Sequence, residues 1–392
     1  VNRLKKINLS GIYLKEEALR YYPQESLASQ VVGFLDADGQ GQYGVEGSYD
    51  DILRGKEGVL EAEKGPAGFL INDKNGAIEN GSDIFLTLDY NIQFRAEKLL
   101  EEAKENLRFE EGEIIVSDPK TGKILALANF PSFNPNKYSE VPDLAVFQNS
   151  SIQKVFEPGS VVKPITMASA LQEEKITPQT TYVDEGFLKI GGYTIRNYDK
   201  RTWGKRTMTE VLEKSINTGA VFVQKQLGNS VFEEYLGKFG IFEPTGIDIK
   251  GEVFSKNKEL KKGYEINFAT AAFGQGVEMT SLQLVRAFSV IANNGKLIKP
   301  YIVEKILEKD KVKETRPEIQ NPSVISQKTA TQLTAMLISV TENGFAKGAR
   351  VPGYYIAGKT GTAQIPWGAL GINRKGYSDK TIQSFIGFAP AL

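Results

Sequence analysis

Apolar residues between positions 84 and 128 follow a pattern that predicts alternating strands and helices. Residues 84–88 form a short apolar run typical of a strand, and Asp89 directly after it is a favourable N-cap. The next apolar side chains recur at helical spacing on one face: Ile92, Ala96, Leu99, Leu100, Ala103 and Leu107. Two more apolar runs, residues 113–117 and 123–128, flank a Pro/Gly turn and predict a hairpin. This order predicts an α+β domain with an antiparallel sheet and flanking helices.

The rest of the chain continues the pattern. Helical periodicity predicts further helices at about 161–173, 209–214, 218–227, 281–293 and 327–341. Residues 354–359 and 382–388 are typical of strands near the end of the chain. Most of these apolar faces are interpreted as core packing.

The first 80 residues differ from this pattern, because they are rich in glycine and charged residues. Residues 30–35 are typical of a short strand, and residues 36–41 have the chemistry of a loop. We therefore expect a small N-terminal domain over residues 1–80 and a larger domain over residues 81–392.

Composition narrows the possible chemistry. The 392 residues contain 48 Lys and Arg, 48 Asp and Glu, and no Cys or His. Disulfides, thiol nucleophiles, Cys/His metal sites and Ser-His-Asp triads are therefore excluded, and no metal or cofactor is predicted. The balanced charge gives no polyanion-binding surface, so nucleic acid is not an expected partner. No apolar run of about 18 residues is present, and we expect any membrane anchor to lie upstream of Val1.

Three short motifs occur in order and suggest one catalytic site. They are Ser160-Val161-Val162-Lys163, Ser215-Ile216-Asn217 and Lys359-Thr360-Gly361-Thr362. Each motif alone is weak, because other matches occur at Ser151 to Lys154, Ser255 to Lys258, Ser132 to Asn134 and Lys120 to Gly122. Local context is needed to choose among the copies.

Ser160 follows Glu157-Pro158-Gly159 and precedes an apolar stretch, which predicts a position at a helix N-terminus. Lys163 would lie one turn later on the same face. A neutral, buried Lys163 could accept the proton of the Ser160 hydroxyl. The alternative is an N-cap serine followed by a surface lysine.

Ser215 and Asn217 fall between two predicted helices. One interpretation places Ser215 in a proton relay between Lys163 and Lys359, with Asn217 bonded to a substrate amide. The alternative is ordinary turn chemistry, since Ser and Asn are common in turns.

Lys359, Thr360, Gly361 and Thr362 lie inside a strand-like run rather than in a turn. Glycine within a strand often marks the close approach of a ligand or another backbone. The N–H groups of Thr362 and Ser160 could form an oxyanion hole, and Lys359, Thr360 and Thr362 could hold a substrate carboxylate.

These motifs and their order resemble the class B penicillin-binding proteins. The larger domain is similar to that family's transpeptidase domain in residues 118–126, 156–164, 272–276, 357–364 and 384–390. The first domain resembles the family's pedestal, or dimerisation domain, in residues 20–23, 27–33, 44–46, 49–50 and 53–55. Relative to the family, the chain lacks the membrane helix and ends early, so a truncated transpeptidase domain is expected.

The resemblance implies a serine DD-transpeptidase that cross-links peptidoglycan stem peptides through an acyl-enzyme on Ser160. It implies Lys163 as the base, with Ser215 and Lys359 relaying protons, and β-lactams as covalent inhibitors of the same serine. It also implies a place on the extracytoplasmic face of the bacterial cytoplasmic membrane, a role in division or elongation, and a membrane-embedded glycan polymerase of the shape, elongation, division and sporulation family as partner.

Two other functions remain open from the sequence. A β-lactamase or β-lactam sensor would share the fold, but no extra deacylating glutamate is evident and the pedestal argues against it. A non-catalytic scaffold would keep the fold without the chemistry, although all motif residues are present.

Overall fold

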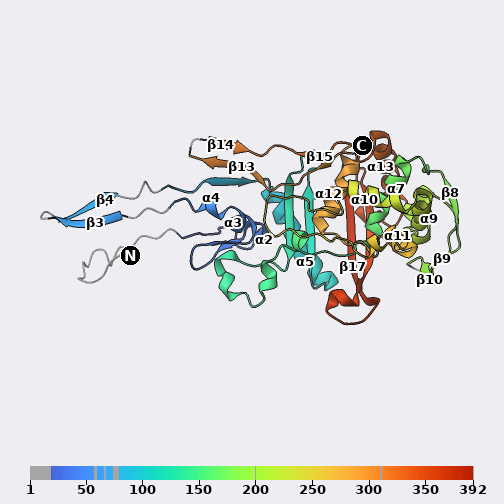
Figure 1. Cartoon of the computed structure of the whole chain (residues 1–392), viewed down its shortest axis with the longest axis horizontal. Helices are drawn as coiled ribbons and strands as arrows, with labels where there is room; N and C mark the ends of the chain where they lie inside the picture. The colour runs from blue at the N-terminus through green and yellow to red at the C-terminus, as the bar shows by residue number, and fades with distance from the viewer. Residues whose placement is uncertain are drawn as a thin grey trace.

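The computed structural model describes residues 19–56, 60–65, 68–73, 79–198, 200–309 and 311–391. The chain is elongated, with the β3–β4 hairpin near one end and helices α7, α9, α10 and α11 toward the other (Figure 1). Their bounds are Leu60–Gly65 (β3), Gly68–Asp73 (β4), Lys163–Gln172 (α7), Asn217–Leu227 (α9), Asn229–Lys238 (α10) and Glu265–Ala271 (α11). Within the described residues, no helix combines the length and apolar character that a membrane crossing requires.

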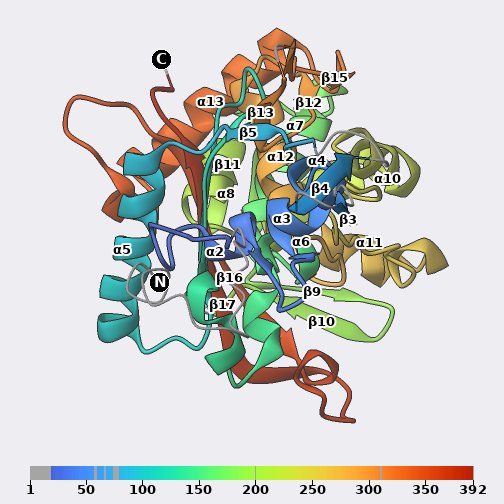
Figure 2. The same ribbon diagram turned by 90° about the vertical axis from the view of Figure 1, so that its left-hand side faces the viewer.

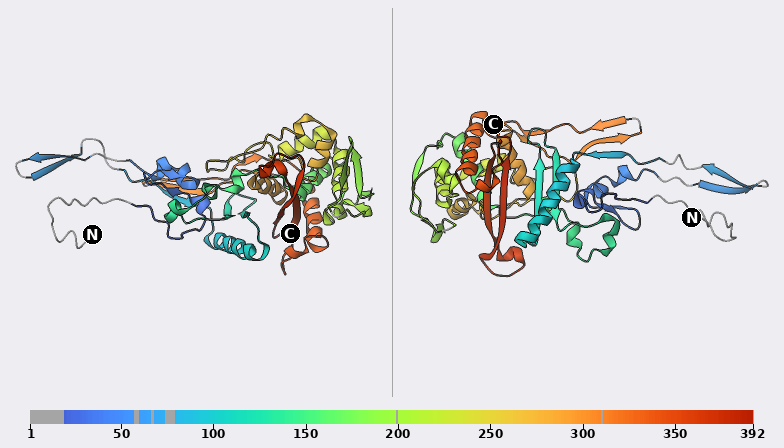
Figure 3. Two further views of the ribbon diagram at one scale, coloured as in Figure 1. Left: turned by 90° about the horizontal axis from the view of Figure 1, so that it is seen from below. Right: turned by 180° about the vertical axis from the view of Figure 1, so that it is seen from behind.

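The N-terminal part consists of short elements. They are α2 (Ser29–Val32), β1 (Phe34–Leu35), β2 (Gly41–Gln42), α3 (Gly44–Ser48) and α4 (Asp50–Leu53). Figure 3 shows the β3–β4 hairpin projecting beyond them. The prediction of one strand over residues 30–35 is wrong. Ser29–Val32 form a helical turn instead, and Gly33, with φ 81°, redirects the chain so that only Phe34 and Leu35 pair as a strand. Residues 1–18, which belong to the predicted first domain, lie outside the described residues.

The predicted strand, helix and hairpin of residues 84–128 are confirmed. Strand β5 (Asp83–Leu86) precedes helix α5 (Tyr90–Leu107), and the Asp89 carboxylate accepts the backbone N–H groups of Asn91 and Ile92 as predicted for an N-cap. Strands β6 (Gly112–Ser117) and β7 (Ile124–Phe130) pair antiparallel. Figure 2 shows α5 on one side of the molecule and the β9–β10 hairpin on the other.

Strand β5 pairs with a distant part of the chain. It lies against β13 (Val303–Glu308), which also pairs with β14 (Lys311–Glu314). Two shorter strands, β12 (Leu297–Ile298) and β15 (Ile319–Asn321), form a separate pair. The segment directly after residue 80 is thus joined to residues beyond 300.

The helical part encloses the largest hydrophobic core. Helix α7 lies within it, and nine of its ten residues are buried. The remaining helices are α6 (Ser150–Gln153), α8 (Met208–Glu213), α12 (Ser281–Ala292) and α13 (Gln327–Glu342), and the 3₁₀ segments are η1 (Pro135–Glu140), η2 (Leu144–Phe147), η3 (Gly159–Val162), η4 (Leu260–Lys262), η5 (Lys347–Ala349) and η6 (Trp367–Leu370). The helices predicted from periodicity are therefore confirmed, with ends that differ by a few residues.

Three antiparallel strand pairs pack against these helices. The long ribbon consists of β16 (Ala357–Pro366) and β17 (Tyr377–Phe388), and α13 packs against β16. The small pairs are β8 (Thr181–Asp184) with β11 (Gly204–Thr207), and β9 (Phe187–Ile190) with β10 (Tyr193–Arg196). Every pair of named strands is antiparallel, so the predicted α+β fold with an antiparallel sheet and flanking helices is confirmed.

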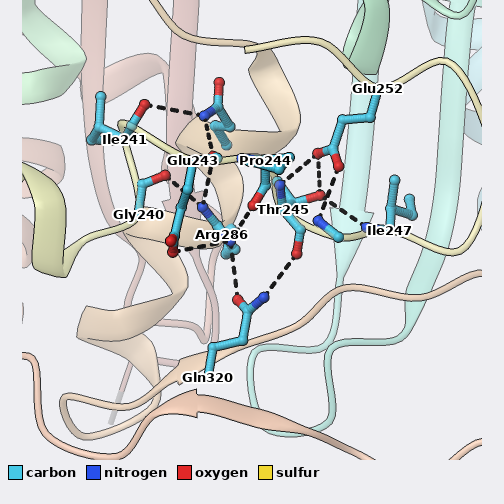
Figure 4. Close-up of polar contacts among 11 residues, drawn as sticks. Gly240, Ile241, Glu243, Pro244, Thr245, Ile247, Glu252, Arg286 and Gln320 are labelled. Carbon is cyan, nitrogen blue, oxygen red and sulfur yellow. Dashed lines mark hydrogen bonds and ion pairs between the residues drawn. The ribbon is translucent and has the colours of Figure 1, made fainter. Parts of the chain in front are cut away.

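A buried arginine joins α12 to the loop that follows α10 (Figure 4). The Arg286 side chain is almost fully enclosed and donates to the carbonyls of Gly240 and Pro244 and to the Gln320 amide oxygen. Gln320 in turn donates to the Thr245 carbonyl at 2.9 Å. These hydrogen bonds replace the water that the two terminal guanidinium nitrogens would lose on burial, so they hold the loop against the core.

Candidate active site

Ser160 lies in a tight turn that leads directly into α7. Segment η3 (Gly159–Val162) is a 3₁₀ turn, and the Lys163 N–H donates to the Ser160 carbonyl. The helix predicted to begin at about residue 161 begins at Lys163, and Ser160 lies in the 3₁₀ turn directly before it. Pro164 then falls in the first turn of α7, where its missing N–H leaves no helical hydrogen bond unmade.

Lys163 is enclosed, with 1% of its surface exposed. Its Nζ lies 2.7 Å from the Ser215 carbonyl, 3.1 Å from Ser215 Oγ and 2.8 Å from Asn217 Oδ1. None of these partners is a carboxylate, and no ion pair to Lys163 occurs among the described residues. The alternative of a surface lysine is therefore wrong.

Lys359 reaches the same hydroxyl from β16. It is fully buried, and its Nζ lies 3.0 Å from Ser215 Oγ and 2.8 Å from the Thr360 carbonyl. The Ser215 hydroxyl therefore contacts two lysine side chains that come from different elements. A single proton can pass between them through this oxygen.

Burial changes the charge of both lysines. It lowers the pKa of Lys163 well below the usual lysine value, and the charge of nearby Lys359 lowers it further. Burial also lowers the pKa of Lys359, to about 7. At neutral pH the pair therefore holds fewer than two protons, which leaves a neutral amine available as a base.

Ser215 occupies an unusual backbone conformation. Its φ of 52° lies in the left-handed region, which residues other than glycine rarely adopt. The turn is fixed by hydrogen bonds from the Ser215 N–H to the Leu212 carbonyl and from the Ile216 N–H to the Val211 carbonyl. Local strain of this kind is common at functional sites. In this conformation the Ser215 hydroxyl contacts both amines.

Asn217 is engaged at both ends of its side-chain amide. Its oxygen accepts from Lys163, and its nitrogen donates to the Arg196 carbonyl at 3.0 Å. The structure thus places Asn217 beside the two lysines, and its nitrogen contacts protein rather than facing open space.

Gly361 allows β16 to approach the turn that carries Ser160. A Cβ atom at position 361 would lie 2.5 Å from Ser384 Oγ, 2.9 Å from Val161 Cγ1 and 3.1 Å from the Pro158 carbonyl oxygen. The expectation that this glycine marks a close backbone approach is confirmed. Thr360 and Thr362 flank it and are half-buried, and Thr362 Oγ1 donates to Gln383.

Two neighbouring features were not predicted from the sequence. The Gly274 carbonyl accepts the Gly159 N–H, so residues distant in the chain hold the turn before Ser160. Glu157 accepts from the Tyr377 hydroxyl at 2.9 Å, yet burial raises the pKa of Glu157 to about 7. Neither contact has a local sequence signal, because each joins segments about a hundred or more residues apart.

Other copies of the motifs lie in different surroundings. In the Lys120 copy, the Lys120 N–H and the Thr121 hydroxyl donate to Asp118 within the β6–β7 turn. Ser255 donates to Glu278 in a loop with exposed lysines. No group of three or more acidic, His or Cys side chains suited to a metal ion occurs among the described residues.

Comparisons with known proteins agree with this geometry. Residues 112–391 match the penicillin binding protein transpeptidase domain, and residues 2–86 match the penicillin-binding protein dimerisation domain. Among curated relatives, stage V sporulation protein D of Bacillus subtilis is 34% identical over 99% of this chain and 60% of its own length. Peptidoglycan D,D-transpeptidase FtsI of Escherichia coli is 31% identical over 99% of this chain and 63% of its own length.

A solved structure has the same fold. Penicillin binding protein 3 of Mycobacterium tuberculosis superposes with a TM-score of 0.84 at 31% identity, covering 95% of this chain and 81% of that one. That protein is also known in complexes with aztreonam and ampicillin. The present chain spans less than two thirds of the length of the curated relatives it matches, for example 60% and 66%. On these matches, the chain belongs to the class B penicillin-binding proteins.

Proposed function

We propose that this protein is a serine D,D-transpeptidase that cross-links peptidoglycan stem peptides through an acyl-enzyme on Ser160. The observation that carries the proposal is the meeting of two buried lysines on the Ser215 hydroxyl, without a carboxylate, beside the turn that carries Ser160. A buried amine of lowered pKa is the kind of base that a serine nucleophile needs in a protein without histidine.

In the first step, Ser160 Oγ attacks the carbonyl carbon of the penultimate D-Ala. The hydroxyl proton passes to Lys163, and the bond to the terminal D-Ala breaks. The relay through Ser215 and Lys359 delivers a proton to the departing amine. The N–H groups of Ser160 and Thr362 stabilise the oxyanion.

In the second step, the amine of a neighbouring stem attacks the acyl carbonyl. The ester bond to Ser160 breaks, and the amine's proton returns to Ser160 Oγ through the same lysines. Lys359, Thr360 and Thr362 hold the donor carboxylate, Gly361 keeps β16 close to the nucleophile, and Asn217 binds a substrate amide after exchanging its Arg196 contact.

Relatives support this activity and its setting. Those of Escherichia coli and Pseudomonas aeruginosa are named peptidoglycan D,D-transpeptidases, and the Mycobacterium tuberculosis neighbour binds two β-lactams. We extend these properties to the present protein: β-lactams acylate Ser160, and the protein acts in division or elongation on the extracytoplasmic face of the membrane. The proposal includes a pedestal domain over residues 1–80, a transpeptidase domain over residues 81–392, and a membrane-embedded glycan polymerase as partner.

Mass spectrometry of the intact protein after incubation with a fluorescent penicillin tests this proposal. One persistent adduct on the peptide that contains Ser160 is expected, with no adduct in Ser160→Ala and a normal adduct in Ser151→Ala. Labelling that survives in Ser160→Ala would contradict the assignment. Rapid hydrolysis of the penicillin without a lasting adduct would indicate a β-lactamase instead.

A further inference from the structure

Three buried polar side chains form a hydrogen-bond network that supports the turn carrying Ser215 and Asn217. They are Asp184 at the end of β8, Asn197 directly after β10, and Thr218 in the first turn of α9. None belongs to the three catalytic motifs, and each is at least 97% enclosed by protein. Polar groups this deeply buried persist when hydrogen bonds compensate for the lost water.

Asn197 acts on the start of α9. Its side-chain oxygen accepts the backbone N–H groups of Asn217 at 3.0 Å and Thr218 at 3.3 Å. The first N–H groups of a helix have no partner within the helix, and an N-cap side chain normally supplies one. The N-cap of α9 is Ile216, which cannot do so. The cap therefore comes from the β9–β10 hairpin.

Asp184 holds Asn197 in place. The Asn197 side-chain nitrogen donates to Asp184 at 2.9 Å and to the Arg201 carbonyl at 3.0 Å. Asp184 also accepts from the Thr218 hydroxyl at 2.6 Å and the Trp203 N–H at 2.8 Å. Burial acts to raise the pKa of Asp184, but these hydrogen bonds hold it below its usual value, so the carboxylate stays charged.

The same hairpin also contacts the Asn217 side chain. Arg196, the neighbour of Asn197, accepts the Asn217 side-chain N–H through its carbonyl. Asn217 is thus held by its backbone and by its side chain, and its remaining oxygen lies 2.8 Å from Lys163 Nζ. A continuous series of hydrogen bonds runs from Asp184 through Asn197 and Asn217 to Lys163.

We propose that Asp184 and Asn197 are positioning residues for the proton relay, and that they set the angle at which the Ser215–Asn217 turn meets the Lys163 amine. The inference rests on the proposed function, because it assigns a role relative to Lys163 as the base. A loosened turn would admit water beside Lys163. Burial would then lower the Lys163 pKa less, and the amine would stay protonated to higher pH.

The titratable groups around the relay decide how the pH profile is interpreted. Lys359 is the charged group that lowers the pKa of Lys163 in the described part of the chain. Asp184 titrates below its usual value, and Tyr182, whose hydroxyl contacts Thr218 at 3.0 Å, titrates above its usual value. Neither group changes charge near neutral pH. Glu157, three residues before Ser160, has a pKa raised by burial to about 7, so the same profile measured in a Glu157→Gln background separates its titration from that of the lysines.

Penicillin acylation rates of the full chain, measured from pH 5.5 to 9.5 alongside thermal unfolding, test the proposal. Asn197→Ala is expected to acylate about 10- to 100-fold more slowly at neutral pH. The pH at which its acylation rate falls on the acidic side of the profile is expected to be higher than in the wild type. Thr218→Val keeps the side-chain shape, removes the hydroxyl bonded to Asp184, and is expected to show a smaller change in the same direction. It decides the question if Asn197→Ala does not fold.

Gln93→Ala is the matched control. Gln93 lies on α5, away from the site. Its side-chain amide is equally buried and accepts the Leu127 N–H. Gln93→Ala is expected to lower the unfolding temperature without changing the pH dependence of the acylation rate. Wild-type rates and an unchanged pH dependence in both Asn197→Ala and Thr218→Val would overturn the inference, even with labelling at Ser160 intact. Labelling that persists in Ser160→Ala would instead overturn the proposed function.

Discussion

Two Ser-x-x-Lys sequences stand close together in this chain, and their surroundings give them different chemistry. Lys154 forms an ion pair with Glu111 and keeps 59% of its side chain exposed, while the Ser151 hydroxyl donates to Glu113. Lys163 has 1% of its surface exposed, and its hydrogen-bond partners in the described part of the chain are a carbonyl, a hydroxyl and an amide oxygen. The tetrapeptide alone therefore does not make a base. Enclosure without a carboxylate lowers the pKa of Lys163, as the proposed role of a base requires.

Arg286 extends the comparison to a second kind of buried cation. Burial lowers the pKa of Arg286 to about 10, and backbone carbonyls surround its guanidinium, so it remains charged at neutral pH. Burial lowers the pKa of Lys359 to about 7, where it readily exchanges a proton. One buried cation stabilises a loop, and the other can take part in proton transfer.

Replacing each lysine of the two Ser-x-x-Lys copies should give the largest contrast. Lys163→Met is expected to slow penicillin acylation by about 10²- to 10⁴-fold, because it removes the proposed general base. Lys154→Met should change the rate less than about twofold, since an exposed ion pair contributes little. Time-resolved labelling at pH 7.5 measures both. Equal losses in the two variants would show that burial does not distinguish the copies.

Arg286→Met should affect stability rather than acylation. It leaves the buried Gly240 carbonyl without its donor and removes the hydrogen bond to the Pro244 carbonyl, and we expect a loss of about 3 kcal/mol in the free energy of unfolding. Thermal or urea unfolding measures this loss, with the exposed Arg95→Met as control. An unchanged unfolding temperature would mean that the network in Figure 4 does not support the loop.

Lys359→Met should give the smallest change, and that change should depend on pH. The folded state holds the Lys359 pKa below the unfolded value, so between about 7 and 10.5 the unfolded chain binds more protons. The destabilisation caused by this lysine is therefore complete below pH 7 and is relieved as pH rises toward 10.5. We expect Lys359→Met to raise the unfolding temperature by a few degrees at pH 6, with a difference that shrinks by pH 10.

The second Lys-Thr-Gly copy supplies the control for this experiment. Lys120 is exposed in the β6–β7 turn, so Lys120→Met should leave the unfolding temperature unchanged at both pH values. A gain from Lys359→Met that is equal at pH 6 and pH 10 would argue against a titrating buried lysine.

The contrast between local and distant interactions explains what the sequence could predict. Periodicity correctly located α5, α12 and the β6–β7 hairpin, because each is determined by neighbouring residues. The strand predicted over residues 30–35 was wrong, since the β-branched pair Val31 and Val32 packs in a helical turn that ends at Gly33.

At the candidate site, motif order and context selected the residues that the structure brings together. Ser215 and Lys359 are 144 positions apart and meet through one hydroxyl. The roles of Asp184 and Asn197 could not be predicted, because an aspartate and an asparagine near glycines are typical of ordinary turns. Their burial and their contacts with α9 arise only from tertiary packing.

The charge state of the buried lysines is the most direct test of this account. Nuclear magnetic resonance of isotopically labelled lysine side chains, assigned with Lys163→Met and Lys359→Met, would follow each amine through pH. We predict that Lys359 titrates at about pH 7 and that Lys163 also titrates well below the usual lysine value. Titration of both amines near pH 10.5 would contradict the central claim that burial provides the base for Ser160.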